Sequence, residues 1–316
     1  MSTIDVSNNL GAPHAGKDSP LYRMISSKAG SGQSVVGGTF LSPDSIDHSG
    51  LWSAGWWGLD TSSVFAKFSS EQQKEVLCNC NQSLLKEAYF IEKSGLAYSA
   101  KMILTARNTD EAQLFAFIGS DEAKHLAWIE PYVPAQQKLS PAGHFLAFLS
   151  SLIEEYPPNL LPYLVQVILE GWGLDHYSRL AKSCLDSDLA AIFASILKDE
   201  ALHHRSGAVL FESCKLSSRD FSLIEDALQQ YTMMVRVGPQ STLSIVDRVA
   251  GGLAEGELQD VLIALHHEDE TLRKLQLLKS LMKQPQVDHL VQMLDAESCF
   301  LPASLPEAVD CFLSSR

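Results

Sequence analysis

A short pattern of glutamate and histidine occurs twice in the chain and could hold metal ions. The pattern is a single glutamate followed by Glu-x-x-His, and its two copies comprise Glu92, Glu122 and His125, then Glu170, Glu200 and His203. The copies are offset by 170 − 92 = 78 residues, and within each the glutamates are 30 residues apart, since 122 − 92 = 30 and 200 − 170 = 30. Carboxylates suit hard divalent cations, and imidazole suits iron. Four carboxylates would balance the charge of two such cations, so we predict a dinuclear metal site.

The 30-residue spacing has a geometric meaning if each half of the repeat is a helical hairpin. From Glu92 a helix can descend about 15 residues to a turn at residues 108–109, and a second helix can climb about 13 residues back to Glu122. Because each residue adds the same rise, the two carboxylates return to the same height. A turn near residues 185–187 gives the second half the same form. Glutamate and histidine three residues apart share one helix face, so all six side chains can converge.

Helical periodicity runs from residue 70 onward, and capping residues and prolines divide it. Residues 70–73 fit a capping box, Asn108 and Asp186 are candidate caps, and Pro131 and Pro157 end the helices before them. We expect helices over residues 70–107, 109–130, 141–155, 160–184, 186–215, 219–236, 241–252, 255–283 and 286–297, and a short helix after residue 300. No segment has a convincing strand pattern, so the predicted fold class is all-α.

The first 65 residues differ in composition from the rest. They contain three of the five tryptophans, Trp52, Trp56 and Trp57, and a Gly/Ser-rich stretch at residues 29–38. We predict an irregular N-terminal arm over residues 1–65 that packs through its aromatic side chains and has a disordered tip. Residues 66–316 are expected to form a single helical domain, with a metal-binding bundle at 70–215 and additional helices at 216–316.

The repeated segments resemble the ferritin-like di-iron superfamily, over residues 70–215. The resemblance is carried by Glu92, Asp121-Glu122-x-x-His125, Glu170 and Asp199-Glu200-x-x-His203. It implies a four-helix bundle that binds two iron ions, or a manganese–iron pair, through the two glutamates and two Glu-x-x-His motifs. It also implies that Asp121 and Asp199 each bond the free ring nitrogen of the histidine on the opposite hairpin, which fixes the tautomer of that histidine.

Other residues near the repeat are weighed as parts of the site. Glu87 competes with Glu92 for the role of single glutamate, but it has no counterpart in the second half, since 87 + 78 = 165 is Val165. Tyr98 and His176 lie six residues after the single glutamate of each half, and they are candidate hydrogen-bond partners of the ligands. We therefore assign Glu92 to the metal and place Tyr98 and His176 around it.

Two glycines and one charged run stay open to more than one interpretation. Gly95 and Gly173 lie one turn after the single glutamates, where a missing side chain would either make room for dioxygen or substrate or allow close helix packing. The run His-His-Glu-Asp-Glu at residues 266–270 has the composition of a metal site but lacks the repeat. We interpret this run as a solvated helix face.

The resemblance implies a dioxygen-activating oxidase or oxygenase that hydroxylates, N-oxygenates or desaturates a small organic substrate. The arm and the helices after residue 215 favour this function, because a substrate cavity needs walls and a lid. A fresh turnover needs two electrons, so a reductase or ferredoxin is the expected donor. The alternatives are a ferroxidase or a rubrerythrin-like peroxidase, and a non-catalytic helical protein whose carboxylates pair with basic residues. No CxxC pair occurs, which disfavours rubrerythrin.

The overall charge restricts the partners. With 24 basic and 38 acidic residues the formal net charge is −14, which argues against nucleic acid, because phosphate binding needs basic patches. No apolar stretch is long enough for a membrane span, and six cysteines are too few for a disulfide framework. We expect a soluble cytoplasmic protein whose long amphipathic helices could also support a homodimer.

Overall fold

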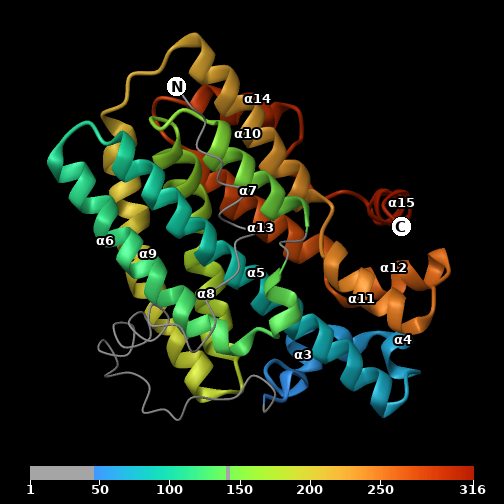
Figure 1. Cartoon of the computed structure of the whole chain (residues 1–316). Helices are drawn as coiled ribbons and strands as arrows, with labels where there is room; N and C mark the ends of the chain where they lie inside the picture. The colour runs from blue at the N-terminus through green and yellow to red at the C-terminus, as the bar shows by residue number, and fades with distance from the viewer. Residues whose placement is uncertain (1–45, 140–142) are drawn as a thin grey trace.

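The computed structural model describes residues 46–139 and 143–316, and within these ranges the chain forms helices and no strand (Figure 1). The predicted all-α class is therefore confirmed. In chain order the elements are η2 (His48–Gly50), α3 (Ala54–Trp57), η3 (Leu59–Thr61), α4 (Ser63–Ala66), α5 (Ser70–Thr105), α6 (Thr109–Ile129), η4 (Glu130–Tyr132), η5 (Ala135–Leu139), α7 (His144–Glu155), η6 (Pro162–Glu170), α8 (Gly171–Ser183), α9 (Ser187–Glu212), α10 (Ser218–Arg236), α11 (Gln240–Ala250), α12 (Glu255–Ala264), α13 (His267–Met282), α14 (Asp288–Ala296) and α15 (Leu305–Ser314).

Two helical hairpins make up the central bundle. α5 packs along α6, η6 and α8 pack along α9, and α6 packs against α9 (Figure 1). Local capping sets their starts: the Asn108 side chain accepts a hydrogen bond from Glu111 N at 3.0 Å, and the Asp186 side chain accepts one from Leu189 N at 2.7 Å. The capping box of α5 begins one residue earlier than predicted, at Ser69. The turns therefore lie where the 30-residue spacing requires them.

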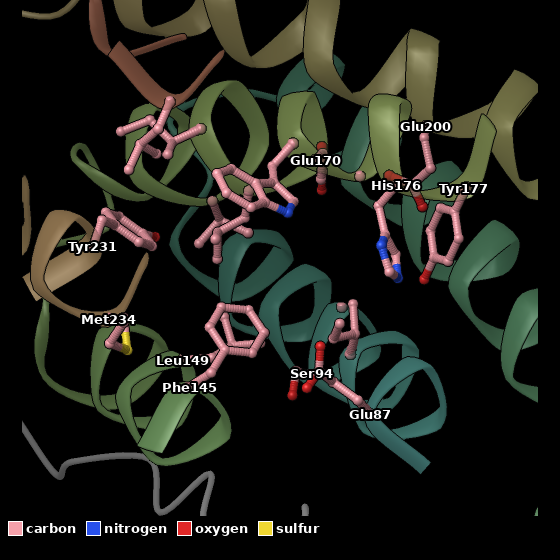
Figure 2. A pocket seen from close by; sticks show the side chains of 18 of the residues that line it. Glu87, Ser94, Phe145, Leu149, Glu170, His176, Tyr177, Glu200, Tyr231 and Met234 are labelled. Carbon is pink, nitrogen blue, oxygen red and sulfur yellow. The ribbon is translucent and has the colours of Figure 1, made fainter. Parts of the chain in front are cut away.

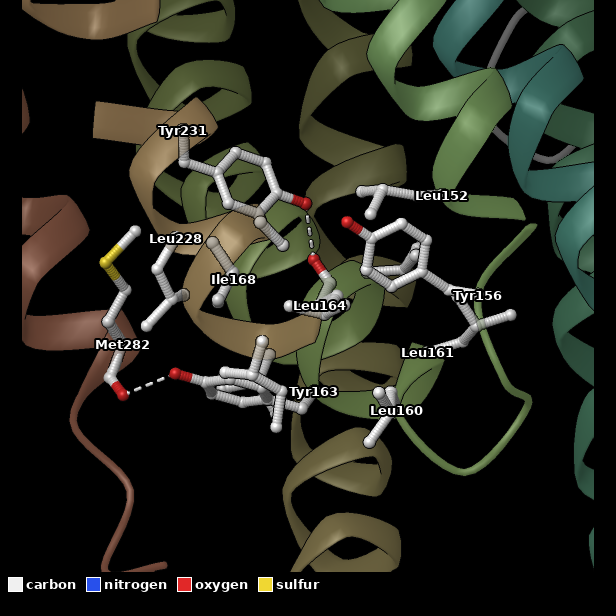
Figure 3. Packing of buried hydrophobic residues seen from close by; sticks show 14 of the residues in the cluster. Leu152, Tyr156, Leu160, Leu161, Tyr163, Leu164, Ile168, Leu228, Tyr231 and Met282 are labelled. Atoms are coloured by element: carbon white, nitrogen blue, oxygen red, sulfur yellow. Dashed lines mark hydrogen bonds between the residues drawn. The ribbon is translucent and has the colours of Figure 1, made fainter. Parts of the chain in front are cut away.

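The predicted helix over residues 160–184 contains a π-helix in its first half, which the sequence pattern did not reveal. The wider i→i+5 hydrogen bonding extends over Pro162–Glu170 and is followed by the regular helix α8. Other elements satisfy polar groups along this segment. The Tyr231 hydroxyl donates to Leu164 O at 2.7 Å, and the Tyr163 hydroxyl donates to Met282 O at 2.7 Å (Figure 3). Tertiary contacts from α10 and α13 thus accompany the irregular backbone.

The predicted single helix over residues 255–283 is wrong, because it is broken into α12 and α13. His266 lies at the break with φ of 50°, a left-handed conformation that interrupts the helix. The interpretation of residues 266–270 as a solvated face is also wrong for His267. This side chain is buried, and its Nε2 lies 2.8 Å from Ala303 O.

The helices outside the bundle extend it in two places. α10 and α13 pack against η6 and share one apolar core with it. α11, α12 and α15 pack with α4 and the first turns of α5 in another. None of the helices among the described residues is long and apolar enough to cross a lipid bilayer.

The described part of the N-terminal arm consists of short helical turns packed on the bundle. Trp52 is fully buried, its ring lies 6.0 Å from that of Phe193, and its Nε1 donates to Leu180 O at 3.4 Å. Trp57 Nε1 donates to the buried Asn81 side chain at 2.9 Å. The predicted disordered tip lies outside the described residues.

Candidate metal centre

The six predicted ligands converge in the middle of the bundle. Glu92 comes from α5, Glu122 and His125 from α6, Glu170 from the end of η6, and Glu200 and His203 from α9. Their ligand atoms form two overlapping groups, and within each group the atoms lie within 4.8 Å of one another. One group comprises Glu92, Glu122, His125 and Glu200, and the other comprises Glu122, Glu170 and His203. All are buried except Glu170, which is partly buried.

The imidazole Nδ1 atoms face the carboxylates. His125 Nδ1 lies 3.0 Å from Glu92 Oε2, and His203 Nδ1 lies 3.3 Å from Glu122 Oε1. Glu200 is placed between the two rings, with one oxygen 3.7 Å from His125 Nδ1 and the other 3.7 Å from His203 Nδ1. With an imidazole on each side of it, Glu200 would help to hold a pair of cations.

Two aspartates hold the other ring nitrogens in a crossed arrangement. His125 Nε2 lies 3.1 Å from Asp199 Oδ2, and His203 Nε2 lies 3.4 Å from Asp121 Oδ2, so each hairpin supplies the aspartate for the histidine of the other. Lys124 Nζ lies 2.6 Å from Asp121 and 3.7 Å from Asp199, and it ties the two carboxylates together. With Nε2 held in this way, Nδ1 of each ring is directed at the centre.

Replacing Asp199 with alanine is expected to weaken metal binding by about 10–100-fold, because His125 loses the partner that fixes its orientation and basicity. Titration of the metal-free protein with Fe(II) under anaerobic conditions measures the affinity. Asp188→Ala is the matched control, since Asp188 is an exposed residue in the first turn of the same helix. Equal affinities for the two variants would contradict the positioning role of Asp199.

The charge of the cluster favours cations. Burial and the neighbouring Glu200 carboxylate raise the pKa of Glu122 to about 8, and burial raises the pKa of Glu170 well above its usual range. Glu170 Oε2 is a buried atom that has no hydrogen-bond partner. Buried carboxylates and unpaired polar atoms are costly unless they are paired or coordinated. The residues therefore fit a pair of divalent cations.

The histidine rings reinforce this conclusion. Burial lowers the pKa of His125, but its contacts with Asp199 and Glu92 outweigh burial and raise the pKa to about 10. Contacts with Asp121, Glu122 and other carboxylates likewise raise the pKa of His203. The surroundings of both rings thus favour positive charge, and cations bound at Nδ1 would take the place of these protons.

A cavity of about 340 Å³ reaches the carboxylates of the cluster (Figure 2). Glu92, Glu122, Glu170 and Glu200 form part of its wall. Most of the remaining wall is apolar and comes from α7, η6, α8, α10 and α13. The volume falls at the lower end of the roughly 300–1,000 Å³ range of small-molecule pockets. The metal-ligand cluster is therefore open to a compact organic molecule.

The hydrogen bonds around the cluster include residues that the sequence did not single out. The Tyr177 hydroxyl donates to Glu92, and the Gln166 amide donates to His203 O at 3.0 Å. Tyr98, a predicted partner of the ligands, donates instead to Gln166 Oε1 at 3.0 Å. The other predicted partner, His176, lies in the cavity wall. Tyr177 could have been found, because it lies two helical turns after Glu170 on the same face.

The chain is thus a helical protein with a buried Glu/His cluster that is compatible with a di-iron site. All six cysteines are unpaired, so no disulfide constrains this arrangement. No protein-family model, no curated protein and no solved structure matches the chain.

Proposed function

We propose that this protein is a dioxygen-activating di-iron oxidase or oxygenase that acts on a small organic substrate. The observation that carries the proposal is the cavity, whose wall combines an apolar lining with four carboxylates of the metal-ligand cluster. A centre that only stores iron or removes peroxide does not need an apolar chamber of this size beside its ligands. A chamber of this kind orients an organic molecule and excludes water from it.

The residues of the cluster have distinct roles in this proposal. Glu92, Glu122, His125, Glu170, Glu200 and His203 would hold the two iron ions, with Asp121 and Asp199 orienting the imidazoles. The bound ions would supply the electrons for the reduction of dioxygen. The Tyr177 hydroxyl donates to Glu92 and keeps that carboxylate oriented. Hydroxylation of a C–H bond takes two electrons from the substrate and two from the bound ions, consumes two protons and yields water. A reductase or ferredoxin is the proposed donor that would return two electrons to the ions.

Anaerobic loading with Fe(II), followed by exposure to oxygen, tests the proposed function. We expect about two iron ions per chain and oxygen uptake in proportion to the number of loaded sites. Further Fe(II) should not be taken up, because a catalytic centre does not grow a mineral core. Iron content after desalting and an oxygen electrode give the two measurements. Continued uptake of Fe(II) with oxygen would favour ferroxidase activity, and an absence of bound iron would contradict both functions.

A further inference from the structure

One end of the cavity carries charged and polar groups that do not belong to the metal-ligand cluster. Glu87 from α5, His176 from α8 and Lys274 from α13 line this end. Figure 2 shows Glu87 and His176 directed into the same open space. Lys274 is close enough to influence the titration of both. Among the described residues, however, no hydrogen bond or ion pair within 4.0 Å joins any of the three to another protein group. We call these three residues the polar end of the cavity.

The two opposite charges at the polar end have no protein partner while the cavity is empty, although Glu87 is exposed and Lys274 is half-buried. Partial desolvation raises the pKa of Glu87, and the positive charge of Lys274 partly offsets this rise. Burial lowers the pKa of Lys274, and nearby acidic groups, Glu87 among them, only partly offset this. Burial lowers the pKa of His176 to about 4, so this ring is neutral at physiological pH. A ligand that supplied one group of each charge would pair with both residues.

The charged residues around Lys274 are already paired, which leaves Lys274 available to a ligand. Arg179 Nη1 lies 2.8 Å from Glu270 Oε2, Arg273 Nε lies 3.2 Å from the same oxygen, and Arg273 Nη1 lies 3.0 Å from Asp175 Oδ2. This network contains two positive and two negative charges and is neutral as a whole. Lys274 belongs to the same helix as Glu270 and Arg273 but faces the cavity instead.

The opposite end of the cavity is apolar. Phe145, Leu149, Tyr231 and Met234 lie there, on the side away from Glu87 and His176 (Figure 2). The Tyr231 hydroxyl is already bonded to Leu164 O, so the ring is what Tyr231 offers to a ligand. This end fits a hydrocarbon or aromatic group.

In the view of Figure 2, Glu170 of the metal-ligand cluster lies between the two ends, whereas Glu200 lies on the same side as His176. Glu92 follows Glu87 by five residues on α5, which is about 7.5 Å along the helix. Glu170 precedes His176 by six residues, about 9 Å along the other wall. A compact molecule whose charged head lies at the polar end therefore presents its apolar body, rather than the head, to the cluster.

We propose that the substrate is an amino acid with an apolar side chain, bound with its carboxylate at Lys274, its ammonium group at Glu87 and its side chain beside the metal ligands. The proposal rests on the proposed function, because it names the substrate class of the same site. A simple carboxylic acid would leave Glu87 without a partner, and a simple amine would leave Lys274 without one. Neutral His176 can accept or donate one further hydrogen bond to the head.

Calorimetric titration of the iron-loaded protein without oxygen tests this substrate class. The probes are L-phenylalanine with its deaminated and decarboxylated analogues, 3-phenylpropanoate and 2-phenylethylamine, and L-leucine with 4-methylpentanoate and 3-methylbutylamine. At least one amino acid should bind, and both of its analogues should bind at least about tenfold more weakly, because each leaves one charged residue of the polar end without a partner. If neither amino acid binds, or an analogue equals its parent, the substrate proposal is overturned.

Two substitutions separate the contributions of the head groups. Lys274→Met should weaken the binding of the amino acid and of the carboxylic acid about tenfold or more, and it should leave binding of the amine unchanged. Glu87→Gln should weaken the binding of the amino acid and of the amine, and it should leave binding of the carboxylic acid unchanged. Lys283→Met and Glu75→Gln, at exposed positions outside the cavity, are the matched controls and should bind as wild type. Equal losses for all ligands in both cavity variants would overturn the assignment of the two charges.

The iron content of each sample distinguishes this proposal from the proposed function. A protein that holds about two iron ions per chain but binds no amino acid keeps its proposed oxygenase function and loses the substrate class. A protein that binds the amino acid but takes up no iron supports the polar end as a binding site and contradicts the oxygenase function.

Discussion

Replacing Glu200 with alanine is expected to reduce the iron content from about two ions per chain to less than about one. Glu200 is the carboxylate that faces both imidazoles, with its two oxygens each 3.7 Å from one Nδ1 atom. Its loss therefore removes a carboxylate that faces both imidazoles, whereas Glu92 faces only that of His125. The measurement is iron content after anaerobic loading and desalting.

The variant Glu200→Gln separates loss of metal from loss of folding. Burial and the neighbouring Glu92 raise the pKa of Glu200, so in the metal-free protein its ionised form is less stable than in water. A neutral amide of the same shape removes this cost. The metal-free Glu200→Gln protein should therefore melt at or above the wild-type temperature while it fails to retain iron. Glu212→Gln, at an exposed position in the last turn of α9, is the control. Wild-type iron affinity in both Glu200 variants would contradict the assignment.

The convergence of the six Glu and His side chains could be predicted from the sequence, because helical geometry is encoded in residue spacing. The i, i+3 relation places a glutamate and a histidine on one face, and the equal 30-residue intervals bring the hairpin halves to the same height. The caps at Asn108 and Asp186 mark the turns and act locally. None of these inferences needs knowledge of contacts between distant parts of the chain. The bundle and the cluster of Glu and His side chains could therefore be predicted from the sequence.

The features that were missed depend on contacts between distant parts of the chain. The π-helix is accompanied by bonds from Tyr231, which follows Leu164 by 67 residues, and from His204, whose Nδ1 lies 3.2 Å from Gln166 O. The break at His266 accompanies burial of the next histidine against the segment before α15. Residue spacing within one helix does not encode such partners.

The position of Glu87 in the cavity shows the same limit of prediction from residue spacing. Glu92, and not Glu87, lies in the Glu/His cluster, and Glu87 has no counterpart in the second half of the repeat. Its position in the cavity, however, depends on α8 and α13, which bring His176 and Lys274 to it. Repeat symmetry predicts what the two halves share, whereas the proposed recognition of a substrate by this cavity depends on residues that only one half has.

The two glycines of the repeat differ in their surroundings, and substituting each with alanine exposes the difference. At Gly95 a Cβ atom would collide with the Glu122 carboxylate and lie only 2.6 Å from its carboxyl carbon. At Gly173 the nearest atoms are ring carbons of Tyr177 at 3.9 Å, an ordinary contact distance. Both glycines line the cavity, but only at Gly95 does the missing side chain make room for the Glu122 carboxylate.

Gly95→Ala is expected to weaken iron binding at least tenfold, and Gly173→Ala is expected to leave it unchanged. Alanine favours a helix over glycine by about 1 kcal/mol at either position, so a loss of iron in Gly95→Ala cannot come from a weaker helix. It must come from displacement of Glu122, which belongs to both ligand groups. Anaerobic Fe(II) titration of the two variants beside wild type provides the comparison. Equal affinities in the two variants would show that Glu122 can move without cost, and would remove it from the set of fixed ligands.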